Sequence, residues 1–207
     1  MSVTSRRLSI FPLGRVILFP RMQLPLHIFE PRYRALINDA MARDQRIGMI
    51  QPRASGEPPP LFQIGCIGRI ADIQALEDGR FDIVLEGEAR FRIVRELEVA
   101  TPFRQVQALP MADDEDDPGI LTSTERAALE MESRRFADHL GYSVDWDAIG
   151  RLDDETLVNA IAQVSPFDIA SKQALLEADL LSERSEMLVQ LMQFHGHGDD
   201  RGPATMQ

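Results

Sequence analysis

The stretch FPRMQLPLHIFEPRY, residues 19–33, decides how the first half of this chain folds. Within it Leu24, Leu26 and Ile28 alternate with other residues, which is the period of a strand with one buried face. Pro25 has no N–H to donate to a sheet ladder, so we expect this strand at an edge or beside a bulge.

The period changes directly after this strand. Apolar residues then recur at intervals of three and four, as they do along one face of a helix: Tyr33, Leu36, Ile37, Ala40 and Met41. Pro31 suits the first turn of that helix, where a missing N–H costs nothing. The stretch therefore predicts a strand that leads straight into a short amphipathic helix.

Strand patterns continue to residue 110. Strands are predicted at 46–51, 62–76, 80–94 and 103–110, with a proline-rich loop at 52–61. Asp78-Gly79 is a strong hairpin signal between two of them, and Gly65 and Gly68 are expected bulge points. About six strands with one early helix indicate a coiled sheet or small barrel.

The remainder of the chain is predicted to be helical. The acidic segment 112–119 is the expected linker. Thr122 and Glu125 form a capping-box pattern that opens a helix ending near Leu140. A second apolar stripe comprises Leu157, Ala160, Ile161 and Val164, and Met187, Leu188, Leu191 and Met192 mark the last helix.

Between these two stripes the segment Ser165-Pro166-Phe167-Asp168 predicts the start of a further helix, with Ser165 as its N-cap. We therefore expect about four helices over 120–195 and a flexible tail at 196–207. Such a unit either packs its own core or shares it with a second copy, so the sequence is compatible with both a monomer and a homo-oligomer.

The two halves differ in charge. Residues 1–110 hold 15 Arg and 12 acidic residues, whereas residues 111–207 hold 7 basic and 21 acidic ones, so the halves carry +3 and −14 and the chain −11. An acidic surface repels phosphate, so we do not expect general nucleic-acid binding. A single cysteine, Cys66, and the lack of a long apolar run favour a cytoplasmic protein without a membrane segment.

Several of these segments together resemble a known family. They are FPLGRVILFPRMQLPLHIFEPRYRALINDA, IGRIADIQALEDGRFDIVLEGEARFRI and KQALLEADLLSERSEMLVQLM, spread over roughly residues 7 to 195. The chain resembles the N-terminal substrate-binding domain of the Lon ATP-dependent protease. Its most specific matches are Phe11-Pro12-Leu13, Phe19-Pro20, Pro25-Leu26, Phe29-Glu30-Pro31-Arg32-Tyr33, Gly79-Arg80 and Gly87 followed by Arg90-Phe91.

The resemblance implies an α+β fold, with a PUA-like β pseudo-barrel over 1–111 followed by an all-α subdomain over 120–195. It also implies a stand-alone, non-catalytic module that binds unfolded or apolar polypeptide segments, as an adaptor in quality control or beside a protease. One departure is Arg21, where the family usually has glycine, and arginine tolerates a positive φ poorly.

The residues themselves give no support for an enzyme. A phosphate-binding P-loop needs G-x-x-x-x-G-K-[ST], and the chain's one lysine, Lys172, follows Ser171 outside any such motif. Adjacent helical residues point to different faces, so Ser171 and Lys172 cannot act as nucleophile and base. We expect no ATPase module, no Ser-Lys peptidase and no cofactor.

Other candidate chemistry has a plainer interpretation. His195, His197, Asp199 and Asp200 have metal-ligand types, but a mobile tail pays ordering entropy to hold an ion, so we expect no metal. Glu86 and Glu88 are expected to form ion pairs with Arg80, Arg90 or Arg92. Arg90 and Arg92 beside Phe91 suggest the alternative function, RNA binding, although acidic residues share that hairpin.

The expected site is a polypeptide-binding cleft between the barrel and the helices. Leu61 and Phe62, after the proline-rich loop, are its candidate wall residues, and Met22 and Met49 are its adaptable ones.

Overall fold

The computed structural model describes residues 4–111 and 119–197, which form two compact units. The first unit, called the β unit, comprises the chain up to residue 118 together with Asp168–Leu176. The second, the helical unit, comprises 119–167 and the chain from Glu177 onward. The predicted linker at 112–119, except Gly119, and the predicted tail beyond His197 lie outside the described residues.

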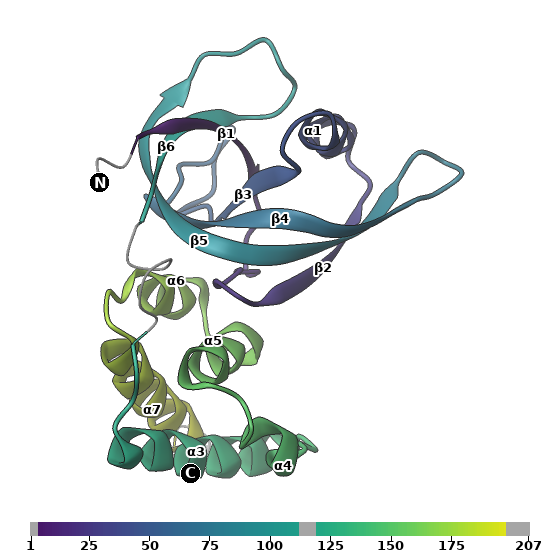
Figure 1. The fold of residues 1–207 in the computed structure, drawn as a ribbon. Helices are drawn as coiled ribbons and strands as arrows, with labels where there is room; N and C mark the ends of the chain where they lie inside the picture. The colour runs from purple at the N-terminus through teal and green to yellow at the C-terminus, as the bar shows by residue number, and fades with distance from the viewer. Residues whose placement is uncertain (1–3, 112–118, 198–207) are drawn as a thin grey trace, which may run out of the picture. The chain divides into compact units, whose positions relative to one another are not determined.

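Six strands and one early helix build the β unit, as the alternating pattern predicted (Figure 1). The strands are β1 (Arg6–Pro12), β2 (Gln23–Ile28), β3 (Arg46–Ile50), β4 (Ile64–Ala75), β5 (Phe81–Leu97) and β6 (Gln105–Pro110), and the helix is α1 (Pro31–Met41). The α+β fold class is therefore confirmed.

The sheet closes because the long strand β5 pairs with three others, β2, β4 and β6. The strand order is β2-β5-β4-β3-β1-β6, and the long β5 also pairs with β6. Most pairs are antiparallel, whereas β1 runs parallel to β3. Register shifts next to Gly68 and after Ile70 bend the β4–β5 ribbon, so one of the two predicted bulge points is confirmed.

The opening stretch lies as predicted, with β2 at an end of the strand order and α1 directly after it. Its turn contradicts one expectation, because Arg21 adopts a φ of +62°. The Arg21 amide donates to the Gly87 carbonyl at 2.8 Å, and the Gly87 amide donates to the Met22 carbonyl at 2.9 Å. These two hydrogen bonds to β5 hold Arg21 in the left-handed conformation, although arginine intrinsically disfavours it.

The β unit includes helix α6 (Ile169–Glu177) as far as Leu176. The sequence predicted this helix as part of the helical subdomain over 120–195. A buried polar network explains its attachment. Gln51 donates to Gln173 at 3.1 Å, Gln173 donates to the Ile64 carbonyl at 2.9 Å, and the buried Arg90 donates to the Leu176 carbonyl at 3.0 Å. Buried polar groups require such partners, so these bonds favour one position for α6 on the strands.

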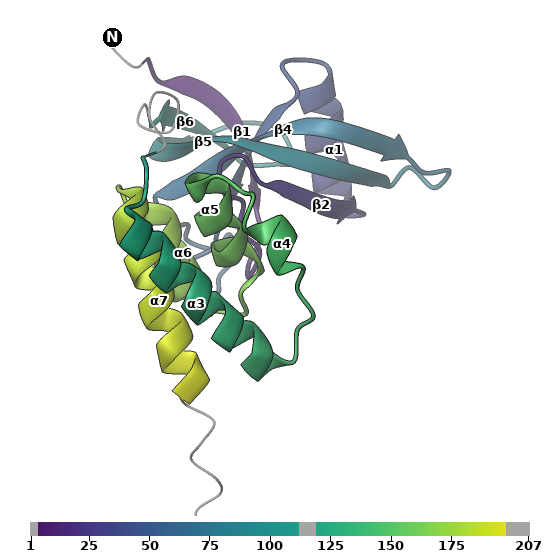
Figure 2. The ribbon, with the colours of Figure 1, turned by 60° about the horizontal axis from the view of Figure 1, so that its bottom comes forward.

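The helical unit contains α3 (Ser123–Leu140), α4 (Trp146–Ile149), α5 (Asp154–Val164) and α7 (Leu181–His197). Helices α3 and α7 pack against each other and lie side by side in Figure 2. The buried Arg184 of α7 donates to Asn159 of α5 at 2.7 Å. The short α4 was not predicted from the sequence.

Two predicted helix starts have different outcomes. The capping box is confirmed, because Thr122 Oγ1 accepts from the Glu125 amide and Glu125 accepts from the Thr122 amide. Ser165 was wrong as an N-cap, since it is the C-cap of α5 and α6 begins at Ile169. Asp168 caps α6 instead, accepting from the Ser171 amide at 2.7 Å.

Replacing Thr122 by alanine is expected to lower the free energy of unfolding by about 1 kcal/mol at neutral pH, because one helix amide loses its partner. The control Thr124→Ala, at an exposed position inside the helix, is expected to be neutral or slightly stabilising. Urea unfolding measures the free energy of unfolding of both variants. Equal losses of stability in the two would contradict a capping role for Thr122.

The same cap has a pH dependence. Hydrogen bonds from the Thr122 amide lower the pKa of Glu125 below its ordinary value. Since the folded-state pKa is depressed, the contribution of Glu125 is present above its unfolded pKa and is lost as the pH falls through the folded one.

No helix in the described ranges is both long and apolar enough to cross a bilayer.

Candidate functional site

An apolar pocket lies within the helical unit, between the second half of α3, the 142–149 segment, α5 and α7. Its volume is about 190 Å³. The lining residues are Ser133, Phe136, Ala137, Leu140, Tyr142, Val144, Trp146, Ile149, Ala160, Ile161, Val164, Ser165, Pro166 and Met192. None of them is charged.

Helix-end signals shape one wall of this pocket. Gly141 ends α3 in the left-handed conformation, at a φ of 71°, which turns the chain back. Asp145 then caps α4 by accepting from the Ala148 amide at 3.0 Å, which places Trp146 and Ile149 on one short helix. The segment that joins α3 to α5 is therefore ordered, with its apolar residues against the pocket.

Helix α5 carries two apolar faces. One face is buried in the unit and includes Leu157, Val158 and Ala162. The predicted stripe is only partly core, because of its four members Leu157 alone is fully buried, whereas Ala160, Ile161 and Val164 line the pocket. Val164 is 71 % exposed, so a large apolar side chain faces solvent at the rim.

Two aromatic residues complete the site. Tyr142 is 53 % exposed, and Trp146 has the guanidinium of Arg134 at 4.7 Å from its ring centroid. A cation over an aromatic face is attracted by the ring quadrupole and holds the ring in position. The pocket is thus a preformed apolar concavity with little hydrogen-bonding capacity, suited to an apolar side chain.

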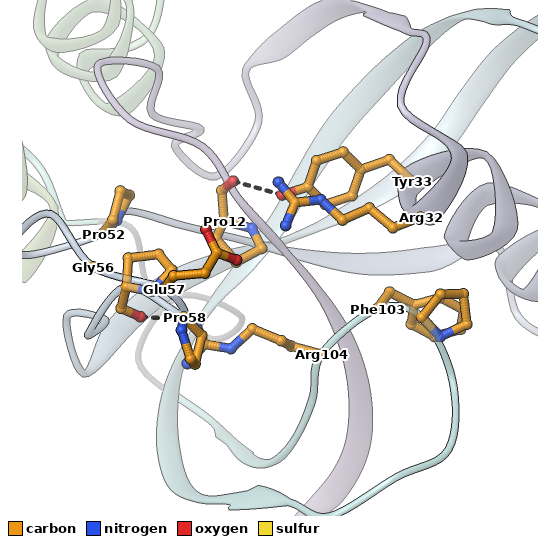
Figure 3. Close-up of a pocket in the computed structure, with 11 residues that line it drawn as sticks. Pro12, Arg32, Tyr33, Pro52, Gly56, Glu57, Pro58, Phe103 and Arg104 are labelled. Carbon is orange, nitrogen blue, oxygen red and sulfur yellow. Dashed lines mark hydrogen bonds between the residues drawn. The ribbon is translucent and has the colours of Figure 1, made fainter.

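A second pocket of about 190 Å³ lies in the β unit and is walled by prolines (Figure 3). Tyr33 donates to the Pro12 carbonyl at 3.2 Å, and burial raises the pKa of Tyr33. Arg32 pairs with Glu30 at 2.9 Å, and Arg104 pairs bidentately with Glu96 at 2.6 and 2.7 Å.

The bond from Arg104 also lowers the pKa of Glu96. Arg104 in addition donates to the Pro59 carbonyl at 2.8 Å, so it ties the proline-rich loop to β5. The neighbouring carboxylates neutralise both arginines. This pocket therefore attracts an incoming anion less strongly than two unpaired guanidinium groups would.

The four predicted site residues do not form one surface. Met49 is 3 % exposed and Met22 packs against the same core cluster. Leu61 packs against a different cluster, and Phe62 is half-buried with its amide donating to the Gln51 carbonyl at 3.1 Å. None of them lines either pocket described above.

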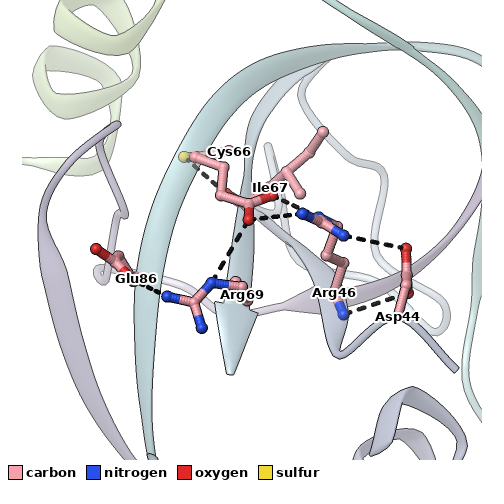
Figure 4. A network of polar contacts seen from close by, with 7 residues as sticks. Asp44, Arg46, Cys66, Ile67, Arg69 and Glu86 are labelled. Carbon is pink, nitrogen blue, oxygen red and sulfur yellow. Dashed lines mark hydrogen bonds and ion pairs between the residues drawn. The ribbon is translucent and has the colours of Figure 1, made fainter. Parts of the chain in front are cut away.

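The carboxylate pair of β5 forms ion pairs, but not with the predicted arginines. Glu88 accepts from Arg46 at 2.5 and 2.9 Å, and Arg69 lies between Glu88, at 3.7 Å, and Glu86 (Figure 4). The hydrogen bond with Glu88 raises the pKa of Arg46. Arg80 instead pairs with Asp78 at 2.6 Å. The extra residue in β5 opposite the Ile67/Gly68 step turns Glu88 toward β3 and β4.

The basic-aromatic pattern of β5 is not on the surface. Arg90 and Phe91 are 1 % and 0 % exposed, so neither is available to stack on or pair with a base. Cys66 is buried, as predicted. In residues 4–111 and 119–197 no group of three His, Cys, Asp or Glu side chains has the arrangement of a metal site.

The sequence does carry one signal for the pocket residues. Tyr142, Val144, Trp146 and Ile149 give a short polar-looking connection an unusual share of large apolar side chains. The stripe on α5 gives no such signal, because periodicity identifies an apolar face without saying what covers it.

A β barrel-like sheet with an attached helix and a separate helical unit that has an open apolar pocket defines a class of binding domain. The model of one family, described as the ATP-dependent protease La (LON) substrate-binding domain, matches residues 7–193. The chain belongs to this family, whose domain is a substrate-recognition module.

Named relatives agree with that assignment. The chain is 28 % identical over 199 residues to Lon protease 2 of Herpetosiphon aurantiacus. This alignment covers 90 % of this chain and 24 % of that protein. The chain thus spans about a quarter of the length of the curated relatives it matches.

Two solved structures share the fold. A Lon N-terminal domain protein from Xanthomonas campestris superposes with a TM-score of 0.69 at 21 % identity, covering 89 % of this chain and 98 % of the other. The N-terminal domain of the Mycobacterium avium complex Lon protease superposes with a TM-score of 0.67 at 20 % sequence identity. That superposition covers 92 % of this chain and 100 % of the other.

Proposed function

We propose that this chain binds exposed apolar segments of polypeptides, and that the pocket of the helical unit receives one of their side chains. The observation that carries the proposal is the second apolar face of α5, which lines a charge-free concavity and leaves Val164 exposed. Exposed apolar surface rimmed by polar residues is typical of an interaction site.

The size of the pocket limits what it takes. A cavity of about 150 Å³ lined by apolar side chains accommodates benzene, so about 190 Å³ suits one phenylalanine or leucine side chain. Burying such a side chain contributes about 1.5–3 kcal/mol, well short of the roughly 8 kcal/mol that a micromolar affinity requires. The remainder of the segment must therefore contribute as well.

Membership of the family supports the biological role that we propose. As a substrate-recognition module, the chain would hold unfolded or apolar segments for proteolysis, in an adaptor role beside a Lon-type protease. Met22, Leu61 and Phe62, which are half-buried on the β unit, are proposed as secondary contacts for longer segments. Met49 is left out because it is buried in the core.

The change Val164→Asp is expected to weaken binding of a phenylalanine-containing, tryptophan-free peptide at least about fivefold, because a charge at the rim must be desolvated when the apolar side chain enters. Trp146 is the chain's one tryptophan and lines the pocket, so its fluorescence reports occupancy directly.

The matched control is Met131→Asp, which changes the charge equally at a 67 % exposed apolar residue of α3 that does not line the pocket. Its affinity is expected to match the unmodified chain, and Phe62→Ala is expected to weaken only longer peptides. Equal affinities of the two aspartate variants, or equal binding of a peptide with serine in place of phenylalanine, would refute the proposal.

A further inference from the structure

The charge of the helical unit narrows the class of segment that its pocket accepts. Its described residues hold thirteen acidic and five basic side chains, which leaves −8. A field of one sign raises the association rate and affinity of partners of the opposite sign.

Acidic residues also lie next to the pocket in the chain. The charged residues within one position of a lining residue are Glu132, Asp138, Asp145, Asp147, Arg134 and Arg135. Of the two arginines, Arg134 is engaged over the Trp146 ring. Asp138 and Asp147 are exposed, and in the described part of the chain no ion pair joins either of them to a basic residue. Their carboxylates are therefore available to an incoming cation.

We propose that the pocket selects a large apolar side chain flanked by lysine or arginine in the bound polypeptide, with Asp138 and Asp147 attracting the flanking cations. This inference rests on the proposed function, because it specifies the ligand of the same pocket. Exposed charges interact over a Debye length of about 8 Å, so carboxylates within that distance of the pocket act on flanking cations before and after docking.

A second copy of this chain fits the pocket less well. The chain carries −11 and the helical unit −8, so two copies repel one another. Phe194, the most exposed phenylalanine described, is flanked by Gln193 and His195 and not by lysine or arginine. The favoured occupant is a different, basic segment.

Four tryptophan-free peptides test the inference on the full chain, with Trp146 fluorescence as the readout. Three carry one central phenylalanine with lysine, glutamine or glutamate flanks, and the fourth carries lysine flanks around serine. We expect affinity to fall in the order lysine, glutamine, glutamate, with the extremes differing on the order of tenfold at ~20 mM salt and about twofold at ~0.5 M.

Two double variants locate the effect. Asp138→Asn with Asp147→Asn is expected to weaken the lysine-flanked peptide about threefold, since exposed pairs contribute little each. Asp179→Asn with Glu186→Gln removes two exposed charges away from the lining positions and is expected to change affinity less than about 1.5-fold.

Each outcome is decisive. Equal affinities for lysine and glutamate flanks, with the phenylalanine requirement retained, would overturn the charge selection and leave the proposed function standing. Binding of the serine peptide as tightly as its phenylalanine counterpart would overturn the proposed function itself. Equal effects of the two double variants would overturn the roles of Asp138 and Asp147.

Discussion

Replacing Gly87 by alanine is expected to destabilise the β unit by about 3 kcal/mol. An added Cβ would lie 2.0 Å from the Phe19 carbonyl oxygen and 3.2 Å from Pro20 Cα, and both are backbone atoms that cannot swing aside. The same glycine exchanges two backbone hydrogen bonds with the turn, so the clash would also separate the opening stretch from β5.

Urea unfolding followed by far-UV circular dichroism measures this loss. Gly14→Ala is the control, because its Cβ would meet only Pro52 Cγ at 3.7 Å, an ordinary contact. We expect a change below about 0.5 kcal/mol there. If Gly87→Ala were as mild as its control, the close approach of the turn to β5 would be wrong.

The second large effect is expected for Phe91→Ala, which should cost about 3–5 kcal/mol, because the ring is fully buried in the cluster that joins β1, β4 and β6. Two glycines make room for this ring. A Cβ on Gly48 would lie 2.9 Å from Phe91 Cζ, and one on Gly65 would lie 2.8 Å from Phe91 Cε1.

A double-mutant cycle tests that relation. Gly48→Ala alone should cost about 1–3 kcal/mol. In the Phe91→Ala background it should cost clearly less, because the clash with the ring is gone and only Leu8 Cδ2, the end of a flexible side chain, remains close at 2.8 Å. Gly65→Ala should stay costly in both backgrounds, since its Cβ also meets the Met49 carbonyl oxygen at 2.3 Å. Strict additivity of Gly48→Ala and Phe91→Ala would count against this packing.

Local signals predicted the local structure well. The alternation in β2, the helix that starts at Pro31 and the capping box at Thr122 all depend on residues a few positions apart. Arg21 shows the limit of this reasoning, because its positive φ is held by bonds to Gly87, which lies far along the chain.

The candidate site was predicted less well for the same reason. The period of α5 identified Ala160, Ile161 and Val164 as apolar, but only the arrangement of α3, α4 and α7 shows that these residues line an open pocket. Met49 was a candidate for its residue type, whereas its burial depends on strands that pair from distant parts of the chain.

By itself, the sequence determined the periods of the strands and of the longer helices and the capping box at Thr122. Its motifs also carried the resemblance to the family, because these features depend on neighbouring residues. Tertiary structure alone decided that α6 joins the strands, that Glu88 binds Arg46, and that α5 turns a second apolar face toward a pocket. The physical reason is that an apolar or charged residue specifies only what it requires of its surroundings. Which distant segment meets that requirement depends on how the whole chain packs.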